Sequence, residues 1–223
     1  MYKALLHKEI IKTGRAFWVC LALAILFTGY AILGINRVIA THDAAHVWLI
    51  MLMKDQTFID SIKYVPLLCG LIIGIAQMTP EMQQRRLKLT LHLPVSPLRL
   101  MLTMLMAGIA ELTLIYLLMI AVIAIYYSGI IAHEMTQSVI FTSFPWFLAG
   151  YTAYLFTAAV CLEGTWRRRI VLSLMGTAIV YCYFMQPAPG AYNSILPAAA
   201  AFTILLLLLS FVSVNRFRQG MID

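Results

Sequence analysis

The chain has 223 residues, of which 62% are hydrophobic and 11% charged, and its mean hydropathy is +0.89. A soluble domain is roughly 45–50% apolar and roughly 25% charged, so this composition excludes disordered, fibrous and disulfide-rich secreted proteins and predicts a membrane protein. The net charge of +7 comes from basic residues that lie between apolar runs, which favours contact with the lipid bilayer and not with nucleic acid. The four cysteines lie in apolar segments without Cys-x-x-Cys spacing, so neither a disulfide framework nor a zinc site is predicted.

Apolar runs predict an all-α membrane protein with one interfacial helix and six membrane-spanning helices. Residues 1–15 combine an apolar face that includes Ile10 with a basic face that includes Lys8 and Lys12, which is typical of a helix lying in the membrane interface. The six predicted spans cover about 16–35, 59–78, 98–127, 141–162, 170–185 and 196–214. The mixed segment 36–58 contains only a short apolar run, which indicates an interfacial or re-entrant piece. Because no internal repeat or linker interrupts the chain, we treat 1–223 as one domain.

The distribution of basic residues predicts the orientation of these spans. If both termini are cytoplasmic, 13 of the 16 lysines and arginines lie on the cytoplasmic side, and only Arg37, Lys54 and Lys63 lie on the other. Basic loops are retained in the cytoplasm during insertion, so this asymmetry favours six spans with cytoplasmic N- and C-termini. A model with five or seven spans would mix the two sets.

The polar segment between the second and third spans carries the strongest functional signal. Pro80 suits the first turn of a helix and Glu81 favours a helix N-terminus, whereas Pro94 and Pro97 stop a helix. We therefore predict a short cytoplasmic helix over 80–94. A stiff basic helix joined to two spans could transmit force from a soluble partner, and the alternative is an amphipathic loop that faces lipid.

Within this segment, Glu81 is followed by three leucines at alternate positions, from 87 to 91, and then by Leu93-Pro94-Val95-Ser96. The pattern resembles the coupling helix of type-2 ATP-binding-cassette permeases, in which a Glu-rich start and a Leu-Pro-Val-Ser ending lie between the second and third of six spans. Arg85-Arg86 stands where that family usually has Gly-Thr, which makes the helix face more basic. The resemblance implies that eight residues couple to the ATPase, namely Glu81, Arg85, Arg86, Leu87, Leu91, Pro94, Val95 and Ser96.

This resemblance implies a permease subunit of an exporter in the inner membrane of a bacterium. Such a subunit dimerises with a second copy or a close relative and docks separate ABC ATPase subunits, which bind ATP and Mg²⁺ while the permease itself binds no cofactor. The residues agree on one point independently of the resemblance. The chain has no G-x-x-x-x-G-K-[ST] loop to bind phosphates and no Gly-Lys dipeptide, so we do not expect it to hydrolyse ATP by that route.

Three further positions are candidate sites outside the coupling segment. Glu111 lies near the middle of the third span, where it lines the translocation path or the dimer seam, or is a neutral carboxyl that hydrogen-bonds a neighbouring helix. Glu163 and Arg167 have i, i+4 spacing after the fourth span, and form a second cytoplasmic contact or a simple topology anchor. His42 and His46 are too few for a closed site, so no metal site is predicted.

Two other function classes stay open at this stage. A membrane scaffold or assembly factor would share the six spans and lack transport activity. An intramembrane enzyme would need a recognisable catalytic motif, but G-x-S-x-G is absent and His133-Glu134 is followed by Gln137 where H-E-x-x-H requires a second histidine. Co-purification with an ATP-hydrolysing subunit would distinguish a permease from both.

Overall fold

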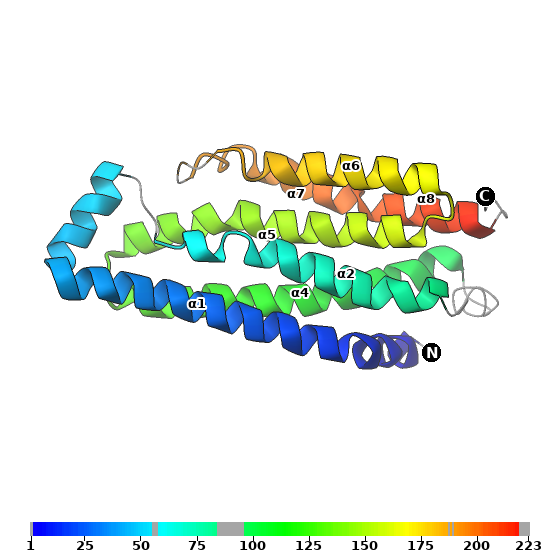
Figure 1. The fold of residues 1–223 in the computed structure, drawn as a ribbon, viewed down its shortest axis with the longest axis horizontal. Helices are drawn as coiled ribbons and strands as arrows, with labels where there is room; N and C mark the ends of the chain where they lie inside the picture. The colour runs from blue at the N-terminus through cyan, green and yellow to red at the C-terminus, as the bar shows by residue number, and fades with distance from the viewer. Residues whose placement is uncertain (1, 55–57, 84–95, 187, 189, 219–223) are drawn as a thin grey trace.

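The computed structural model describes residues 2–54, 58–83, 96–186, 188 and 190–218, and this part of the chain contains helices and no strand. The helices lie side by side in one elongated bundle, and the start of α1 and the end of α8 lie at the same end, which we call the terminal end (Figure 1). Among the described residues, four stretches are long and apolar enough to cross a membrane: Leu5–Thr41, Asp60–Met82, Leu98–Ser128 and His133–Leu162. The chain is therefore an all-helical membrane protein, and the count of six spans stays a prediction.

Helix α1 (Tyr2–Lys54) is continuous through both the predicted interfacial helix and the first span. The predicted boundary at residue 15 is not a helix end, since no proline interrupts this stretch and a single glycine, Gly14, is tolerated inside a helix. The segment 36–54, predicted to be interfacial or re-entrant, continues α1 and bends at the end of the bundle opposite the termini (Figure 1).

Helix α2 (Val65–Gln83) follows the short 3₁₀ helix η1 (Asp60–Ile62) and runs five residues past the predicted end of the second span. Pro80 lies inside α2, so the prediction that it begins a new helix is wrong. A proline is tolerated here because it removes one ladder hydrogen bond close to the helix end. Residues 80–83 of the predicted coupling helix therefore belong to α2, and the remainder of that helix lies outside the described residues.

Helix α4 (Pro97–Ser128) agrees with the predicted third span within one residue at each end, with its proline in the first turn. Helix α5 (His133–Leu162) begins eight residues before the predicted fourth span and contains Pro145. Hydropathy locates the apolar part of a helix, but a helix that continues past the bilayer surface can begin with polar residues such as Glu134.

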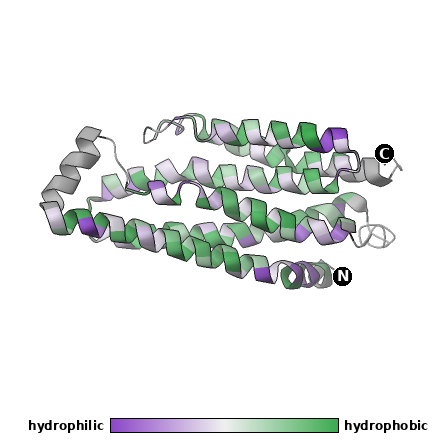
Figure 2. Cartoon of the chain, viewed as in Figure 1, coloured by the Kyte–Doolittle hydropathy of each residue, from purple (hydrophilic) through white to green (hydrophobic). Residues whose placement is uncertain are grey.

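The remaining helices are shorter and pack mainly on α5. They are α6 (Trp166–Cys182), α7 (Leu196–Leu205) and α8 (Leu207–Arg218), and they lie where the fifth and sixth spans were predicted. Seventeen of the 30 residues of α5 are buried, whereas α6 buries only Gly176 and Val180, so α5 is central and α6 peripheral. Figure 2 shows hydrophobic residues along the helices and hydrophilic residues nearer their ends.

Helices α2 and α5 meet backbone to backbone along a seam of glycines. A Cβ atom added at Gly70 would lie 3.0 Å from the carbonyl carbon of Gly150, and one added at Gly150 would lie 2.6 Å from the carbonyl oxygen of Pro66. Small residues permit this approach, which maximises dispersion contact between membrane helices. We call this contact the α2–α5 seam. It fixes the first turns of α2 against the middle of α5.

Candidate functional site

A buried set of polar side chains joins α1, α2, α4 and α5 near the terminal end. Seven residues form this set, which we call the polar network: Glu9, Lys12, Thr13, Gln77, Glu81, Glu111 and Tyr154. Polar groups inside an apolar bundle cost free energy unless they are paired, so their partners determine what the network can do.

The ionic part of the network attaches α1 to the end of α2. The side chain of Glu81 is fully buried, and its Oε1 accepts hydrogen bonds from the Nζ atoms of Lys8 and Lys12, each at 3.0 Å. Lys12 Nζ also lies 2.7 Å from Glu9 Oε2. Lys8 and Lys12 share a helical face because they are four residues apart. This basic face, predicted to lie at the lipid interface, therefore contacts α2.

The neutral part of the network extends inward from Glu9 to α4 and α5. Gln77 Nε2 donates to Glu9 Oε2 at 3.0 Å and to the carbonyl of Met104 at 2.7 Å, and Gln77 Oε1 accepts from the Tyr154 hydroxyl at 2.6 Å. Gly108 of α4 leaves room for these groups, because a Cβ atom there would lie 2.7 Å from Gln77 Oε1. One amide thus bonds with three neighbouring helices, and Gly108 keeps α4 close to them.

Glu111 is the carboxylate that the network does not pair with a cation. Its Oε1 is hydrogen-bonded to the hydroxyl of Thr13, which also lies 2.9 Å from the carbonyl of Glu9. Its Oε2 is buried and has no hydrogen-bond partner among the described residues. The ion pairs found in this part of the chain join Glu9 and Glu81 to lysines and do not include Glu111.

An apolar groove of about 550 Å³ lies between α1 and α4 beside this carboxylate. The described residues that line it are Leu6, Ile10, Gly14, Phe17, Trp18, Met106, Ala107, Ala110, Glu111 and Leu114. Of these, only Glu111 is charged. The groove therefore combines apolar walls with one carboxylate that lacks a cationic partner, an arrangement that resembles a small-molecule site more than a packed interface.

Glu163 and Arg167, the predicted second cytoplasmic contact, do not have the i, i+4 arrangement that their spacing in the sequence suggested. Helix α5 ends at Leu162, so Glu163 and Arg167 do not follow one another on a continuous helix. Glu163 is 2% exposed; its Oε2 accepts from Ser213 Oγ at 3.1 Å, and its carbonyl accepts from Arg169 Nε at 2.7 Å. Arg167 is exposed. Glu163 thus ties the α5–α6 turn to α8, while Arg167 faces outward.

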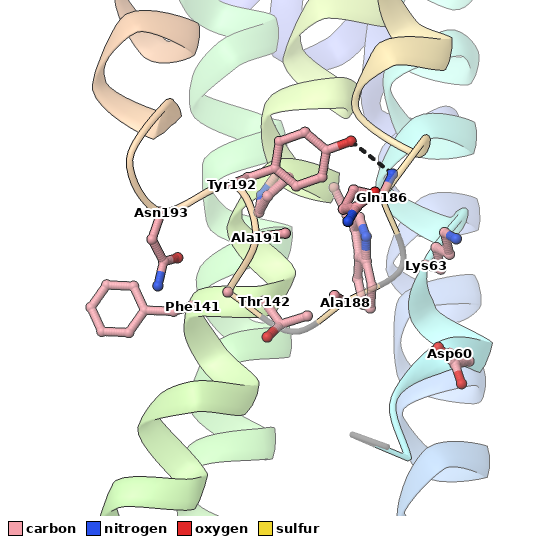
Figure 3. A pocket seen from close by; sticks show the side chains of 12 residues that line it. Asp60, Lys63, Phe141, Thr142, Gln186, Ala188, Ala191, Tyr192 and Asn193 are labelled. Carbon is pink, nitrogen blue, oxygen red and sulfur yellow. Dashed lines mark hydrogen bonds between the residues drawn. The ribbon is translucent and has the colours of Figure 1, made fainter. Parts of the chain in front are cut away.

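A second, smaller pocket lies at the end of the bundle opposite the termini. Figure 3 shows residues from the segment after α6 lying across from Asp60, Lys63 and the α5 side chain of Thr142. Tyr192 lines it; its hydroxyl donates to the carbonyl of Cys182 at 2.6 Å and accepts from the backbone N–H of Gln186 at 3.1 Å, the second of which Figure 3 draws. Its volume of about 30 Å³ holds water-sized molecules and excludes a larger ligand.

The predicted coupling residues fall into two groups. Glu81 is buried in the polar network and Ser96 is exposed before α4, whereas the other six, Arg85, Arg86, Leu87, Leu91, Pro94 and Val95, lie outside the described residues. Sequence reasoning missed the roles of Glu9, Lys12, Gln77 and Tyr154. One available signal was Gln77, an amide inside an apolar run, because such a residue needs partners from neighbouring helices.

Neither a set of metal-binding side chains nor a similarity to known proteins assigns a role to this site. Within the described side chains, no group of three or more His, Cys, Asp or Glu is placed to hold a metal ion. The site is therefore interpreted from its own residues. Comparison with protein-family models, with curated proteins and with solved structures gave no match for this chain.

Proposed function

We propose that this chain is the permease subunit of an ATP-driven exporter of the ATP-binding-cassette class in a bacterial cytoplasmic membrane. It works as a dimer with a second copy or a close relative, and separate ATPase subunits supply the energy from ATP and Mg²⁺. The observation that carries this proposal is the segment 81–96 with its Leu-Pro-Val-Ser ending. The end of α2 and the start of α4, which flank this segment in the sequence, lie at the terminal end, where α1 starts and α8 ends (Figure 1).

The contacts of Glu81 suggest how a push on this segment would reach the membrane helices. Glu81 lies two residues before the last residue of α2, and its carboxylate binds Lys8 and Lys12 of α1. Separating a buried ion pair leaves uncompensated charge, so α1 follows when the end of α2 moves. In this proposal Glu81 holds the helices to the segment, while Arg85, Arg86 and the exposed Ser96 face the ATPase.

The α2–α5 seam would extend the same displacement to the rest of the bundle. Gly70 and Gly150 bring the two backbones into contact, so α2 cannot slide along α5 without a clash. The end of α2 therefore moves together with α1 on one side and α5 on the other. A displacement of this kind is the rigid-body motion that alternating access requires.

Site-specific crosslinking tests the proposal. A photoreactive residue is placed at Ser96, which is exposed at the terminal end, or at Ser128, which is exposed at the opposite end, and each variant is irradiated in its native cells. We expect position 96, and not position 128, to crosslink a protein that carries a G-x-x-x-x-G-K-[ST] loop. A partner without that loop at position 96 would favour a scaffold, and crosslinking to the ATPase from position 128 alone would overturn the proposed orientation.

A further inference from the structure

We propose that the groove between α1 and α4 binds an amphiphilic cation, a molecule with a lipophilic body and a primary ammonium group, and that Glu111 holds the ammonium group. The inference deepens the proposed function, because it names a class of substrate for the permease. It rests on that function for transport, whereas binding itself requires only this chain.

The size of the groove fits a small organic molecule. At about 550 Å³ it lies within the roughly 300–1,000 Å³ typical of ligand sites, and its walls are apolar apart from Glu111. In a bilayer, however, an apolar body gains little by moving from lipid tails to an apolar groove, because both surroundings are similar. Selective binding must therefore come from the polar group, and the groove offers one carboxylate.

The charges around Glu111 point to a missing cation. The ion pairs use the ammonium groups of both Lys8 and Lys12 for the carboxylates of Glu9 and Glu81 and leave the third carboxylate, that of Glu111, without one. If Glu111 is ionised, the polar network together with Lys8 carries one uncompensated negative charge. A bound ammonium ion would neutralise that charge.

The hydrogen bonds of Glu111 lead to the same ligand. Its buried Oε2 has no partner in the described chain, so an ionised oxygen lacks a donor and a protonated one lacks an acceptor. A primary ammonium group brings a positive charge and three donors. In the bound state the ammonium group replaces the Thr13 hydroxyl as the hydrogen-bond donor to Glu111. The Thr13 hydroxyl then donates its single hydrogen to the carbonyl of Glu9.

Two other occupants satisfy this carboxylate less well. A lipid acyl chain fills the apolar walls but supplies neither charge nor donor. A second copy packed symmetrically through the groove would bring two Glu111 carboxylates towards each other, because residues near the axis of such a contact face their own counterparts. Like charges at close range in an apolar setting repel strongly.

Binding can be measured on the purified chain in neutral phosphatidylcholine nanodiscs, without an ATPase. The probe is monodansylcadaverine, in which an environment-sensitive apolar fluorophore carries a primary amine that is protonated at pH 7. Its N-acetyl derivative keeps the fluorophore and loses the charge. We expect the amine to bind about tenfold or more tightly than the acetylated probe, because it gains a charge-assisted hydrogen bond.

Two variants locate this binding. Glu111→Gln keeps the shape of the side chain and removes its charge, so we expect the two probes to bind it equally. Gly14→Leu fills the groove and should abolish binding of both probes; no atom lies within 4 Å of a Cβ at Gly14, so this variant can fold. Gly29→Leu is the matched control, because Gly29 is equally open on the same helix and does not line the groove.

Three outcomes would overturn the inference. Equal binding of both probes to the unaltered chain would indicate an occupant recognised by its apolar body alone, such as a lipid chain. Unchanged binding to Gly14→Leu would place the probe elsewhere. A Gly14→Leu protein that changes from dimer to monomer, with no probe bound to either form, would make a second copy the occupant. None of these results depends on an ATPase, so the permease proposal is judged separately by crosslinking.

Discussion

The glycines of this bundle lie in two contrasting surroundings, one crowded and one open. In the α2–α5 seam, Gly70 and Gly150 have backbone atoms of the facing helix so close that a side chain would not fit. On α1, a Cβ atom added at Gly14 or Gly29 meets nothing within 4 Å. The same residue type thus marks the tightest contact and the most open one. The difference shows that α2 and α5 are in close backbone contact, while the surface of α1 is open at these two positions.

The two contacts also differ in what holds them together. The α2–α5 seam depends on close apolar packing, whereas the contact of α1 with α2 adds to its packing the ion pairs of Lys8 and Lys12 with Glu81. Packing does not change with charge state, but an ion pair weakens when either partner is neutralised or finds another ion. We infer that α1 is the helix whose attachment a ligand or a partner can alter.

The largest effect is expected from Gly70→Leu, which breaks the tight contact. Its side chain would meet the backbone of Gly150, and a backbone cannot move aside as a flexible side chain can. We expect a loss of about 3 kcal/mol or more in the free energy of unfolding, or no folded protein. Thermal unfolding in detergent with size-exclusion chromatography measures this. A variant as stable as the unaltered chain would show that the seam is looser than described.

A smaller loss is expected from Lys12→Met, which weakens the ionic attachment of α1. Lys12 is nearly buried and binds both Glu9 and Glu81, so its removal leaves buried carboxylate charge without compensation. We expect a loss of about 3 kcal/mol from the broken pairs, reduced where the carboxyl groups take up protons. Lys8→Met is the matched control, because the Lys8 side chain is 36% exposed and its pair should contribute about 1 kcal/mol or less. Equal losses in the two variants would contradict the burial of Lys12.

A still smaller loss is expected from Tyr154→Phe, because Tyr154 of α5 belongs to the polar network. The variant removes the hydroxyl that donates to Gln77 Oε1 and leaves the ring in place. The buried amide oxygen then lacks its donor, so we expect a loss of about 1–2 kcal/mol in unfolding free energy. Tyr181→Phe on α6 serves as a control because its side chain is 66% exposed. If both variants unfold alike, the Tyr154 hydroxyl contributes nothing to stability.

The smallest effect is expected from Gly29→Leu, on the open surface of α1. The added side chain meets no neighbour, and leucine favours a helix more than glycine does. We expect the free energy of unfolding to change by no more than about 0.5 kcal/mol, or to rise slightly. The same unfolding assay checks this. A large loss would mean that this face of α1 is covered, which would undo the contrast between the two contacts.

Helix boundaries could be predicted where a chemical signal coincides with the end of an apolar run. Helix α4 has such signals, with Pro97 at its start and Gly129 just past its end, and it was predicted within one residue. Helix α1 has none, so its polar first turns were taken for a separate helix. Pro80 was taken for a helix start, but it lies inside α2 because hydropathy does not show how far a helix extends beyond the bilayer.

The candidate site could be predicted in part. Glu111 was identified from sequence because a carboxylate in the middle of an apolar span is costly wherever it points. Its bond with Thr13 could not be predicted, since those residues are 98 positions apart and meet only through the packing of α1 on α4. For Glu81 the sequence indicated a helix N-terminus facing a partner, and the fold instead buries it beneath two lysines of the same chain.

The sequence by itself determined that this protein lies in a bilayer and that its fold class is all-helical. Composition and the lengths of apolar runs are properties of the chain alone, and they require helices in a bilayer because backbone groups there must bond within their own segment. Only the tertiary structure decided which glycines are crowded, which carboxylates are paired and which one is not. Those properties depend on atoms brought together from distant parts of the chain, and no local pattern records such distances.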